Sequence, residues 1–356
     1  MNMPKPVHTA VARALLSGVG AALLAAGLFG ASTPLAKLLM SGVGPWMLAG
    51  LLYLGSGLGL AVLRVARRAP RARLERGQWP WLLGSVLAGG VVGPVLLMLG
   101  LANMPASGVS LLLNAEGVFT ALLAWFAFNE NFDRRIALGM GAIVAGAIVL
   151  SGPGEARFGP AWPVLTVLGA CLAWGVDNNL TRKVSLADAT WVAMVKGLAA
   201  GSMNLTIALA LGASLPDAGT LAGAGVLGFF AYGISLTLFV VALRHLGTAR
   251  TGAYFSVAPF FGAVLAVLLL GEPVTPALVA AGALMALGVW LHLSERHGHE
   301  HLHEALEHEH EHEHDAHHDH HGPGETPPAR HTHRHRHTPI RHSHAHFPDE
   351  HHRHAH

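Results

Sequence analysis

Long apolar runs alternate with short polar segments from residue 14 to residue 294. Pro, Gly or charged residues bound each run, and the connections are mostly short. Because a helix needs roughly 20 mainly apolar residues to cross a bilayer, each run is expected to form a membrane-spanning helix. The pattern predicts an all-α membrane protein built as a compact bundle. The ten runs lie at 14–39, 46–65, 79–100, 106–128, 134–151, 161–181, 190–212, 220–243, 249–270 and 275–294.

The pattern changes near Ser294, where the apolar runs end and histidine becomes frequent. Of the 26 histidines, 23 lie in residues 295–356, and only about nine residues of that segment are apolar. So few apolar residues cannot offset the entropy lost on ordering. Residues 295–356 are therefore expected to be a disordered His-rich tail.

Charge supports this division of the chain. Residues 1–294 contain 17 Lys and Arg and 9 Asp and Glu, so 9% of them are charged, whereas soluble domains carry about 25%. This low fraction argues against a soluble enzyme. The arginines form clusters between apolar runs and do not follow one helix face, so a nucleic-acid partner is not expected. Cys171 is the only cysteine, which excludes an intramolecular disulfide.

Arginine asymmetry predicts the orientation, because short cytoplasmic loops are enriched in Lys and Arg. If the N-terminus is inside, the inner segments hold 14 positive residues and the outer loops hold only Arg157. Both termini are then cytoplasmic. The membrane in which the protein is expected to lie is the inner (plasma) membrane. The first run continues through Pro34 to Met40, which argues against a cleaved signal peptide. The inner residues are Lys5, Arg13, Arg64, Arg67, Arg68, Arg71, Arg73, Arg76, Arg134, Arg135, Arg182, Lys183, Arg244 and Arg250.

The two halves of the apolar region resemble each other. Five spans per half is an odd number, so the second half must enter the membrane in the opposite sense. Inverted repeats of this kind build many secondary transporters, which bind their substrate between the halves. The expected domains are residues 14–151, 161–294 and the tail 295–356. At offsets of 142 and 145 residues, the matches are Phe119 with Phe261, Glu130 with Glu272, Gly146 with Gly288, Phe29-Gly30 with Trp174-Gly175, and Lys37 with Arg182.

One pattern occurs in both halves: small residues, an aromatic residue, an apolar helix ending in Glu, and then a Gly-rich helix. It spans Glu116–Glu130 and again Ala258–Glu272. This pattern resembles the EamA family of the drug/metabolite transporter superfamily over residues 14–294. The resemblance implies a ten-helix carrier that exports a small metabolite or drug-like solute. Members often carry Pro where this chain has Gly117, which implies a softer helix break in the first half than at Pro259.

Polar side chains inside the spans are the candidates for solute binding or coupling, since they are costly there. Glu116 lies near the middle of the fourth run, with Asn114 two residues before it. It either titrates and contacts solute or only ties helices together. Asp177 and Lys196 lie at similar depths in consecutive runs and form either an ion pair or part of a gate. Asn178 follows Asp177, and Lys37 is expected to snorkel to the interface.

Aromatic residues supply two further candidates. Trp174 and Tyr254 occupy positions that the repeat places toward the pore, whereas most Trp and Tyr near span ends are interfacial anchors. Three Gly-x-x-x-Gly pairs permit close helix packing, so a homodimer is one possible arrangement. They carry little weight in a chain with 43 glycines.

The tail is expected to bind divalent transition metals, because neutral imidazole is a ready ligand for Zn, Ni, Cu and Co. His-x-His runs offer many overlapping weak metal sites. The alternative is a polar low-complexity tail that has no function. The candidate ligands are His299, His301, His303, His308, His310, His312, His314, His333, His335 and His337.

Other function classes have less support. The sequence has no metalloprotease, serine-hydrolase or phosphate-loop motif, so an enzyme and ATP-driven transport by this chain alone are not expected. No cofactor is required, and the expected partners are a small-molecule solute, the lipid bilayer and metal ions on the tail. A divalent-metal efflux carrier fed by the tail is the alternative, and a channel remains open.

Overall fold

The computed structural model describes residues 18–69, 72, 74–128, 134–151, 162–184, 188–246, 251, 254–293, 298–303, 307–313, 330–336 and 340–345. Several residues discussed above lie outside these ranges, among them Lys5, Arg13, Glu130, Arg157, Arg250, His314 and His337. The chain forms two units, Met1–Ser294 and Glu295–His356, which are described separately.

The first half of the helical unit follows the expected apolar runs. Its segments are α2 (Gly18–Leu39), α3 (Pro45–Ala66), the 3-10 turn η1 (Arg76–Gln78), α4 (Trp79–Ser85), the π-helix η2 (Val86–Val92), α5 (Gly93–Asn103), α6 (Ala106–Leu112), α7 (Ala115–Phe128) and α8 (Arg134–Ser151).

The second half repeats this order. Its segments are α9 (Trp162–Arg182), α10 (Ala189–Ala210), α11 (Ala218–Gly228), the π-helix η3 (Phe229–Ile234), α12 (Ser235–Leu246), α14 (Ala258–Leu270) and α15 (Pro276–Leu293). In the described residues, six helical stretches are long and apolar enough to cross a membrane, and three shorter apolar helices accompany them. The polar end of α9, which includes Asp177 and Arg182, lowers its hydropathy.

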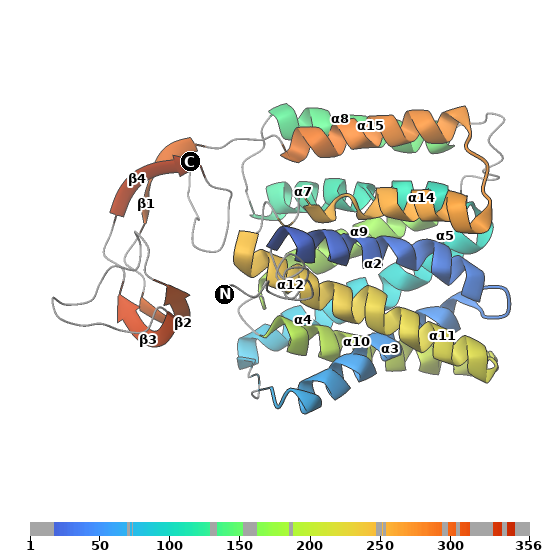
Figure 1. The fold of residues 1–356 in the computed structure, drawn as a ribbon, viewed down its shortest axis with the longest axis horizontal. Coiled ribbons are helices and arrows are strands. Elements are labelled where there is room, and N and C mark those ends of the chain that lie inside the picture. The colour runs from blue at the N-terminus through green and yellow to red at the C-terminus, as the bar shows by residue number, and fades with distance from the viewer. Residues whose placement is uncertain are drawn as a thin grey trace, which may run out of the picture. The chain divides into compact units, whose positions relative to one another are not determined.

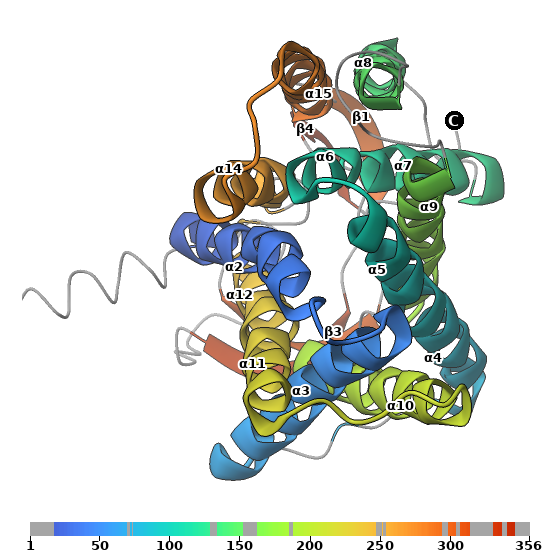
Figure 2. The same ribbon diagram turned by 90° about the vertical axis from the view of Figure 1, so that its right-hand side faces the viewer.

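The helices run roughly parallel or antiparallel to one another, and the α2–α3 and α14–α15 connections lie at the same end of the bundle (Figure 1). Viewed from that end, most helices are arranged around a common axis, while α8 and α15 lie side by side outside this ring (Figure 2). Repeat-equivalent helices therefore pack as partners in the outer pair.

Glycines set the closest helix crossings, and these crossings follow the repeat. A Cβ at Gly30 would meet Phe261 at 3.0 Å, and a Cβ at Gly175 would meet the equivalent Phe119 at 3.1 Å. In the outer pair, a Cβ at Gly146 would meet Met285 at 2.8 Å, and one at Gly288 would meet Ile143 at 2.7 Å. The crossings α2–α14 and α9–α7 are thus counterparts, as the inverted repeat requires.

The Gly-x-x-x-Gly pairs are also used inside the chain. A Cβ at Gly197 would meet the backbone of Gly57 at 2.7 Å, and one at Gly201 would meet Leu54 at 2.5 Å. These contacts join α3 to α10. The motif therefore needs no second copy of the chain to explain it.

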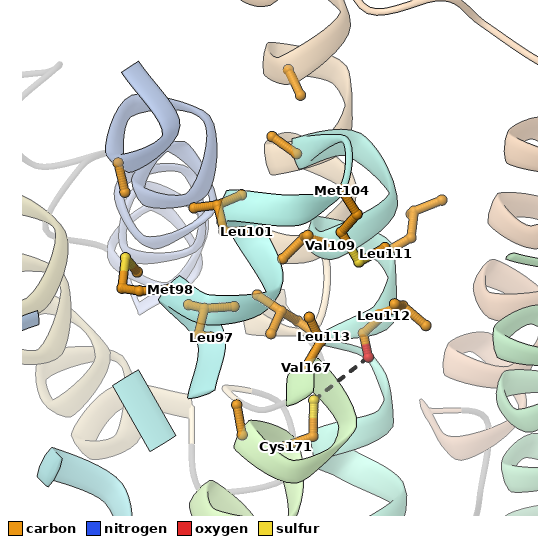
Figure 3. Packing of buried hydrophobic residues seen from close by; sticks show 14 of the residues in the cluster. Leu97, Met98, Leu101, Met104, Val109, Leu111, Leu112, Leu113, Val167 and Cys171 are labelled. Atoms are coloured by element: carbon orange, nitrogen blue, oxygen red, sulfur yellow. Dashed lines mark hydrogen bonds between the residues drawn. The ribbon is translucent and has the colours of Figure 1, made fainter. Parts of the chain in front are cut away.

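The main apolar core lies where α5, α6 and α9 meet (Figure 3). Leu97 and Leu101 of α5, Leu112 of α6 and Val167 of α9 are almost fully buried. The Cys171 thiol donates to the carbonyl of Leu112, with sulfur and oxygen 3.6 Å apart. Cys171 is therefore a buried free thiol that joins α9 to the end of α6.

Both fourth-helix equivalents are interrupted. In the first half the break falls at Leu113 and Asn114 between α6 and α7, although Gly117 stands where Pro was expected. In the second half the chain turns at Ser256 and Val257, and Pro259 lies in the first turn of α14. The first-half break does not need proline, because Asn114 donates its side-chain amide to the Leu111 carbonyl at 2.9 Å.

The described residues of the tail unit include four short strands, and whether the tail as a whole is disordered stays a prediction. Strand β1 (Gly298–His303) pairs antiparallel with β4 (Ile340–Ala345), and β2 (Glu307–Glu313) pairs with β3 (Arg330–Arg336). Histidine alternates with other residues here, and a period of two is typical of a strand. The register also places Glu positions opposite Arg positions, a cross-strand pairing that stabilises sheets. Composition alone does not reveal this complementarity.

Candidate functional site

Glu116 lies in the first turn of α7, directly after the break in the fourth span. Its carboxylate oxygen Oε1 accepts a hydrogen bond from the Asn178 side-chain amide of α9 at 2.9 Å. The same amide lies 3.2 Å from the Thr120 hydroxyl, one turn along α7. Glu116 is therefore joined to the second repeat through Asn178.

Asp177 and Lys196 form the ion pair that their depths suggested. The Lys196 ammonium lies 2.6 Å and 2.7 Å from the two carboxylate oxygens of Asp177. The Ser85 hydroxyl donates to Asp177 Oδ1 at 2.6 Å, and the Thr181 hydroxyl does so at 2.8 Å. Both charged side chains are at most 16% exposed. A salt bridge this deeply buried needs such additional hydrogen bonds to offset desolvation.

The π-helix η2 adds backbone acceptors beside this pair. Its widened turn leaves the Gly89 carbonyl to accept from the Tyr53 hydroxyl at 2.7 Å and from the Trp174 indole at 2.9 Å. The next carbonyl, that of Gly90, accepts from the Asn204 amide at 2.9 Å. Helices α3, α9 and α10 thus all bind the same irregular turn. Such π segments are frequent at functional sites.

Aromatic rings from both halves of the chain extend from this point. Tyr53 lies 5.5 Å from Tyr232 of η3, and Tyr232 lies 5.8 Å from Phe29, measured between ring centroids. Phe29 is followed by Phe255 at 5.5 Å and Phe255 by Phe239 at 4.9 Å. Phe29 is the repeat counterpart of Trp174. Each of the two π-helices is therefore contacted by the aromatic residue at this repeat position.

Two of the expected site residues lie elsewhere. Asn114 is buried and bonds the Leu111 carbonyl, with Met285 of α15 beside it. Tyr254 packs against Ala21, Ala22 and Ala242. The structure thus brings together Glu116, Asp177, Asn178, Lys196 and Trp174, and it places Asn114 and Tyr254 in separate contacts.

The network also contains residues that were not among the sequence candidates, including Ser85, Thr120, Thr181 and Asn204. Asn204 is fully buried in α10, and its Oδ1 has no hydrogen-bond partner among the described residues. A strongly polar amide in the seventh apolar run was the signal that could have found it. Ser85 and Thr181 carry no such signal, because hydroxyl side chains are common in apolar helices.

Further ties lie toward the two ends of the bundle. At the end expected to be external, the Glu272 carboxylate accepts from the backbone N–H of Ala106 at 2.6 Å and of Ser107 at 2.8 Å. The Lys37 ammonium donates to the carbonyls of Leu101 and Met104, and its expected reach to the membrane interface stays a prediction. At the opposite end, Arg64 and Asp188 form an ion pair at 2.6 Å.

The helical part of the chain that the structure describes contains no group of three or more His, Cys, Asp or Glu side chains that could hold a metal ion. Of the expected tail ligands, eight lie in the described strands: His299, His301, His303, His308, His310, His312, His333 and His335.

A network of this kind joins helices of both halves, and the sequences of both halves match one family. The EamA-like transporter family matches residues 16–152 and again residues 161–294. The chain belongs to the EamA-like transporter family. This EamA-like protein is a multi-pass membrane protein with two repeats, and the helical membrane fold expected from the sequence is confirmed.

Several relatives of this EamA-like transporter are named as transporters. An uncharacterized transporter of Methanothermobacter thermautotrophicus is 31% identical over 227 residues, which cover 62% of this chain and 66% of that protein. A probable terminal-alkyne amino-acid exporter of Streptantibioticus cattleyicolor is 27% identical, over 66% of this chain and 78% of that protein. A probable amino-acid metabolite efflux pump of Salmonella typhimurium is 26% identical, over 54% and 68%.

A solved crystal structure has the same fold. It superposes with a TM-score of 0.59 at 19% identity and covers 76% of this chain and 94% of that one. Membership of the EamA-like transporter family, and not this likeness of fold, implies a small-molecule solute and the lipid bilayer as partners.

Proposed function

We propose that this chain exports a small organic metabolite by alternating access, coupled to an ion gradient. The observation that supports this proposal most directly is that the network of Glu116, Asp177 and Lys196 connects the two repeats. Ser85 and Glu116 come from the first repeat, whereas Asp177 and Lys196 come from the second. Motion of one repeat against the other must therefore rearrange these contacts.

An amino-acid-like solute is the first class to test. Two relatives are named as exporters of amino acids or their metabolites. The network offers both a carboxylate and an ammonium group, which match the two charges of an amino acid. The aromatic rings from Tyr53 to Phe239 offer contacts for an apolar side chain.

The membrane and orientation belong to the same proposal. The protein lies in the inner (plasma) membrane with both termini in the cytoplasm, on the evidence of the arginine distribution. The histidine tail is then a cytoplasmic segment that binds divalent transition metal and regulates export. The 23 histidines of the tail support this role.

A divalent-metal efflux carrier fed by the tail is the competing function. It requires a ligand set within the spans. The described spans bring together Glu116 and Asp177 with amides and hydroxyls, and no three His, Cys, Asp or Glu side chains there lie close enough to hold an ion. An organic solute fits this set of groups better.

Glu116→Gln tests the export function, because glutamine keeps the size of the side chain and its hydrogen bond to Asn178 but cannot titrate. The exported solute is first identified by comparing the culture medium of cells that lack and cells that overexpress the protein. We expect the variant to lower its export at least tenfold, about 1.4 kcal/mol in the barrier, with expression unchanged. Asp217→Asn is the matched control, since Asp217 is exposed and caps α11 away from this network.

Normal export by Glu116→Gln with an unchanged pH dependence would show that Glu116 only connects α7 to α9 through its hydrogen bond to Asn178. The identified solute also separates the two candidate functions. If metal alone accumulates in cells that lack the protein, the efflux carrier for metal replaces the organic exporter.

A further inference from the structure

A carboxylate of the second repeat caps α6, a helix of the first repeat. Glu272 accepts hydrogen bonds from the backbone N–H of Ala106 at 2.6 Å and of Ser107 at 2.8 Å, one on each oxygen. Gly271 ends α14 with a φ of 65°, which glycine adopts without strain, so the chain turns directly before Glu272. The first N–H groups of a helix lack partners within it, and Ala106 and Ser107 are buried. Glu272 therefore satisfies donors that solvent does not reach.

A cation holds the other side of the same connection. Lys37, in the last turn of α2, donates to the carbonyls of Leu101 and Met104 at the end of α5. Carbonyls at the end of a helix carry partial negative charge, and N–H groups at its start carry partial positive charge. The ammonium and the Glu272 carboxylate thus each meet a helix end of opposite sign. Together they hold the α5–α6 connection at both of its sides.

The contact between α6 and α14, the seam, joins the two repeats. The two helices lie side by side (Figure 2), and a Cβ at Gly262 of α14 would meet the Ser110 hydroxyl oxygen of α6 at 2.6 Å. Ser110 is 1% exposed, and its hydroxyl has no hydrogen-bond partner in the part of the chain that the structure describes. A buried polar group without a partner is costly. The closed seam is thus destabilised at Ser110 and held at its end by Glu272.

We propose that the seam is a gate of the transport path and that Glu272 and Lys37 are the latch that holds it closed. This rests on the proposed alternating access, since motion of one repeat against the other must separate helices of different repeats. In the latched state, backbone groups of the α5–α6 connection bind the two side chains. When the seam opens, water binds the same groups and reaches Ser110. Because water replaces these hydrogen bonds, the two states differ little in free energy, as a reversible gate requires.

Two cysteine reporters distinguish an open gate from a frayed helix end. Ser107→Cys lies in the first turn of α6, next to the latch, and Ser110→Cys lies one turn deeper, in the seam. Both native side chains belong to residues at most 2% exposed, so a water-soluble maleimide reaches the reporters only when the structure opens. The native thiol of Cys171 is fully buried, so the chain without reporters measures the background. Labelling of the full chain in detergent needs neither a known solute nor a known orientation.

The latch variants are Glu272→Gln, which leaves one acceptor oxygen for two donors, and Lys37→Met, which keeps the length of the side chain but removes its donors. The matched control is Asp217→Asn, because Asp217 also accepts from two backbone N–H groups but caps α11 within the second repeat. We expect each latch variant to raise the labelling rate of Ser110→Cys about tenfold, the effect of losing one hydrogen bond to a charged group. The control should leave this rate unchanged.

Faster labelling of Ser107→Cys alone, with Ser110→Cys still protected, would overturn the gate and leave Glu272 and Lys37 as contacts that only fix the α5–α6 connection. Fast labelling of Ser110→Cys with an intact latch would overturn it as well, because the seam would then be open without any latch being lost. Thermal unfolding verifies that each variant is folded, and Lys37→Met decides the result if Glu272→Gln does not fold.

The labelling and the export assay fail independently. If the latch variants label as expected but no solute is exported, the opening of the seam stands and the export function falls. If the solute is exported and no latch variant changes the labelling of Ser110→Cys, the gate falls and the export function stands.

Discussion

Asp188 is the residue at which a local helix cap and a tertiary contact coincide. Its Oδ1 accepts from the backbone N–H of Trp191 at 3.0 Å and caps α10, while its Oδ2 binds Arg64 of α3 at 2.6 Å. Partial burial alone would raise the pKa of Asp188, but hydrogen bonds from Arg64 and from Trp191 outweigh it and hold that pKa below its ordinary value. The charged form is therefore the one that the fold stabilises.

Asp188→Ala removes both contacts and is expected to lower stability by about 1–2 kcal/mol, the range for losing a helix cap. Asp188→Asn keeps the cap and should lose less. Because the folded pKa is depressed, the benefit of the charge is complete above the unfolded pKa of about 3.9 and disappears as pH falls through the folded value. Thermal unfolding in detergent at pH 7 and at lower pH measures this.

The difference in Tm between the parent and Asp188→Asn should thus be constant near pH 7 and shrink below about pH 4. Arg64→Gln is the companion variant, since it leaves the cap in place and removes the ion pair with Asp188. An Asp188→Asn protein as unstable as Asp188→Ala would show that the ion pair, and not the cap, dominates at this position.

At the level of single residues, the sequence indicates which side chains need partners inside a membrane but not which way an aromatic side chain is oriented. Glu116, Asp177 and Lys196 stand out in the sequence, because charged groups in apolar runs need partners. Tyr254 and Phe255 differ by one position, which is about 100° around a helix. The repeat pointed to Tyr254, whereas Phe255 joins the aromatic rings.

At the scale of elements, the two π-helices are the feature that organises the network. They occupy repeat-equivalent places in the third and eighth spans, η2 at Val86–Val92 and η3 at Phe229–Ile234. In η2 the Gly89 and Gly90 carbonyls are bonded by side chains of three other helices. The sequence could predict the spans but not these turns, because no residue pattern distinguishes a π turn from an α turn inside an apolar run.

Gly89→Ala tests how tightly η2 is held. A Cβ at Gly89 would overlap the Asp177 carboxylate. This carboxylate is held by Lys196 and Ser85, so it cannot move away without losing those contacts. We expect Gly89→Ala to lower the Tm in detergent and to abolish export. Gly27→Ala is the matched control, because Gly27 lies in α2 with nothing within 4 Å of its added Cβ.

Gly27→Ala should be neutral or stabilise the helix by up to about 1 kcal/mol, the usual gain of Ala over Gly. If both variants behave alike, the close contact of Gly89 with Asp177 does not constrain the fold. A Gly89→Ala protein with normal Tm but no export would show that the close contact is needed for transport and not for stability.

For the whole helical unit, the sequence predicted a multi-pass bundle of apolar helices, because bilayer thickness sets the length that each spanning helix needs. It also predicted the two-fold internal repeat, which the glycine crossings at Gly30 and Gly175 follow. It could not predict which polar residues meet across the repeats. Those contacts depend on how α4, α7, α9 and α10 pack, and side-chain spacing along one helix says nothing about a neighbouring helix.

The last prediction concerns the orientation of the helical unit. Arg64 binds Asp188, and the Gln78 side chain reaches the Lys183 carbonyl at 3.5 Å, so these arginine-rich connections lie at one end of the bundle. Lys37 and Glu272 bind the backbone near Met104 and Ala106 at the other end. Since Lys and Arg are retained on the cytoplasmic side, the first end should be cytoplasmic.

Reporter fusions placed after Arg76 and after Arg250 should therefore both read cytoplasmic, and a fusion after Pro216 should read external. An alkaline phosphatase and a fluorescent protein reporter, active on opposite sides of the membrane, give independent readings at each position. The site after Arg250 is decisive, because it follows the eighth span and reports the orientation of the second repeat. An external reading there, with a cytoplasmic reading after Arg76, would mean that the arginine distribution does not set the orientation of the second half.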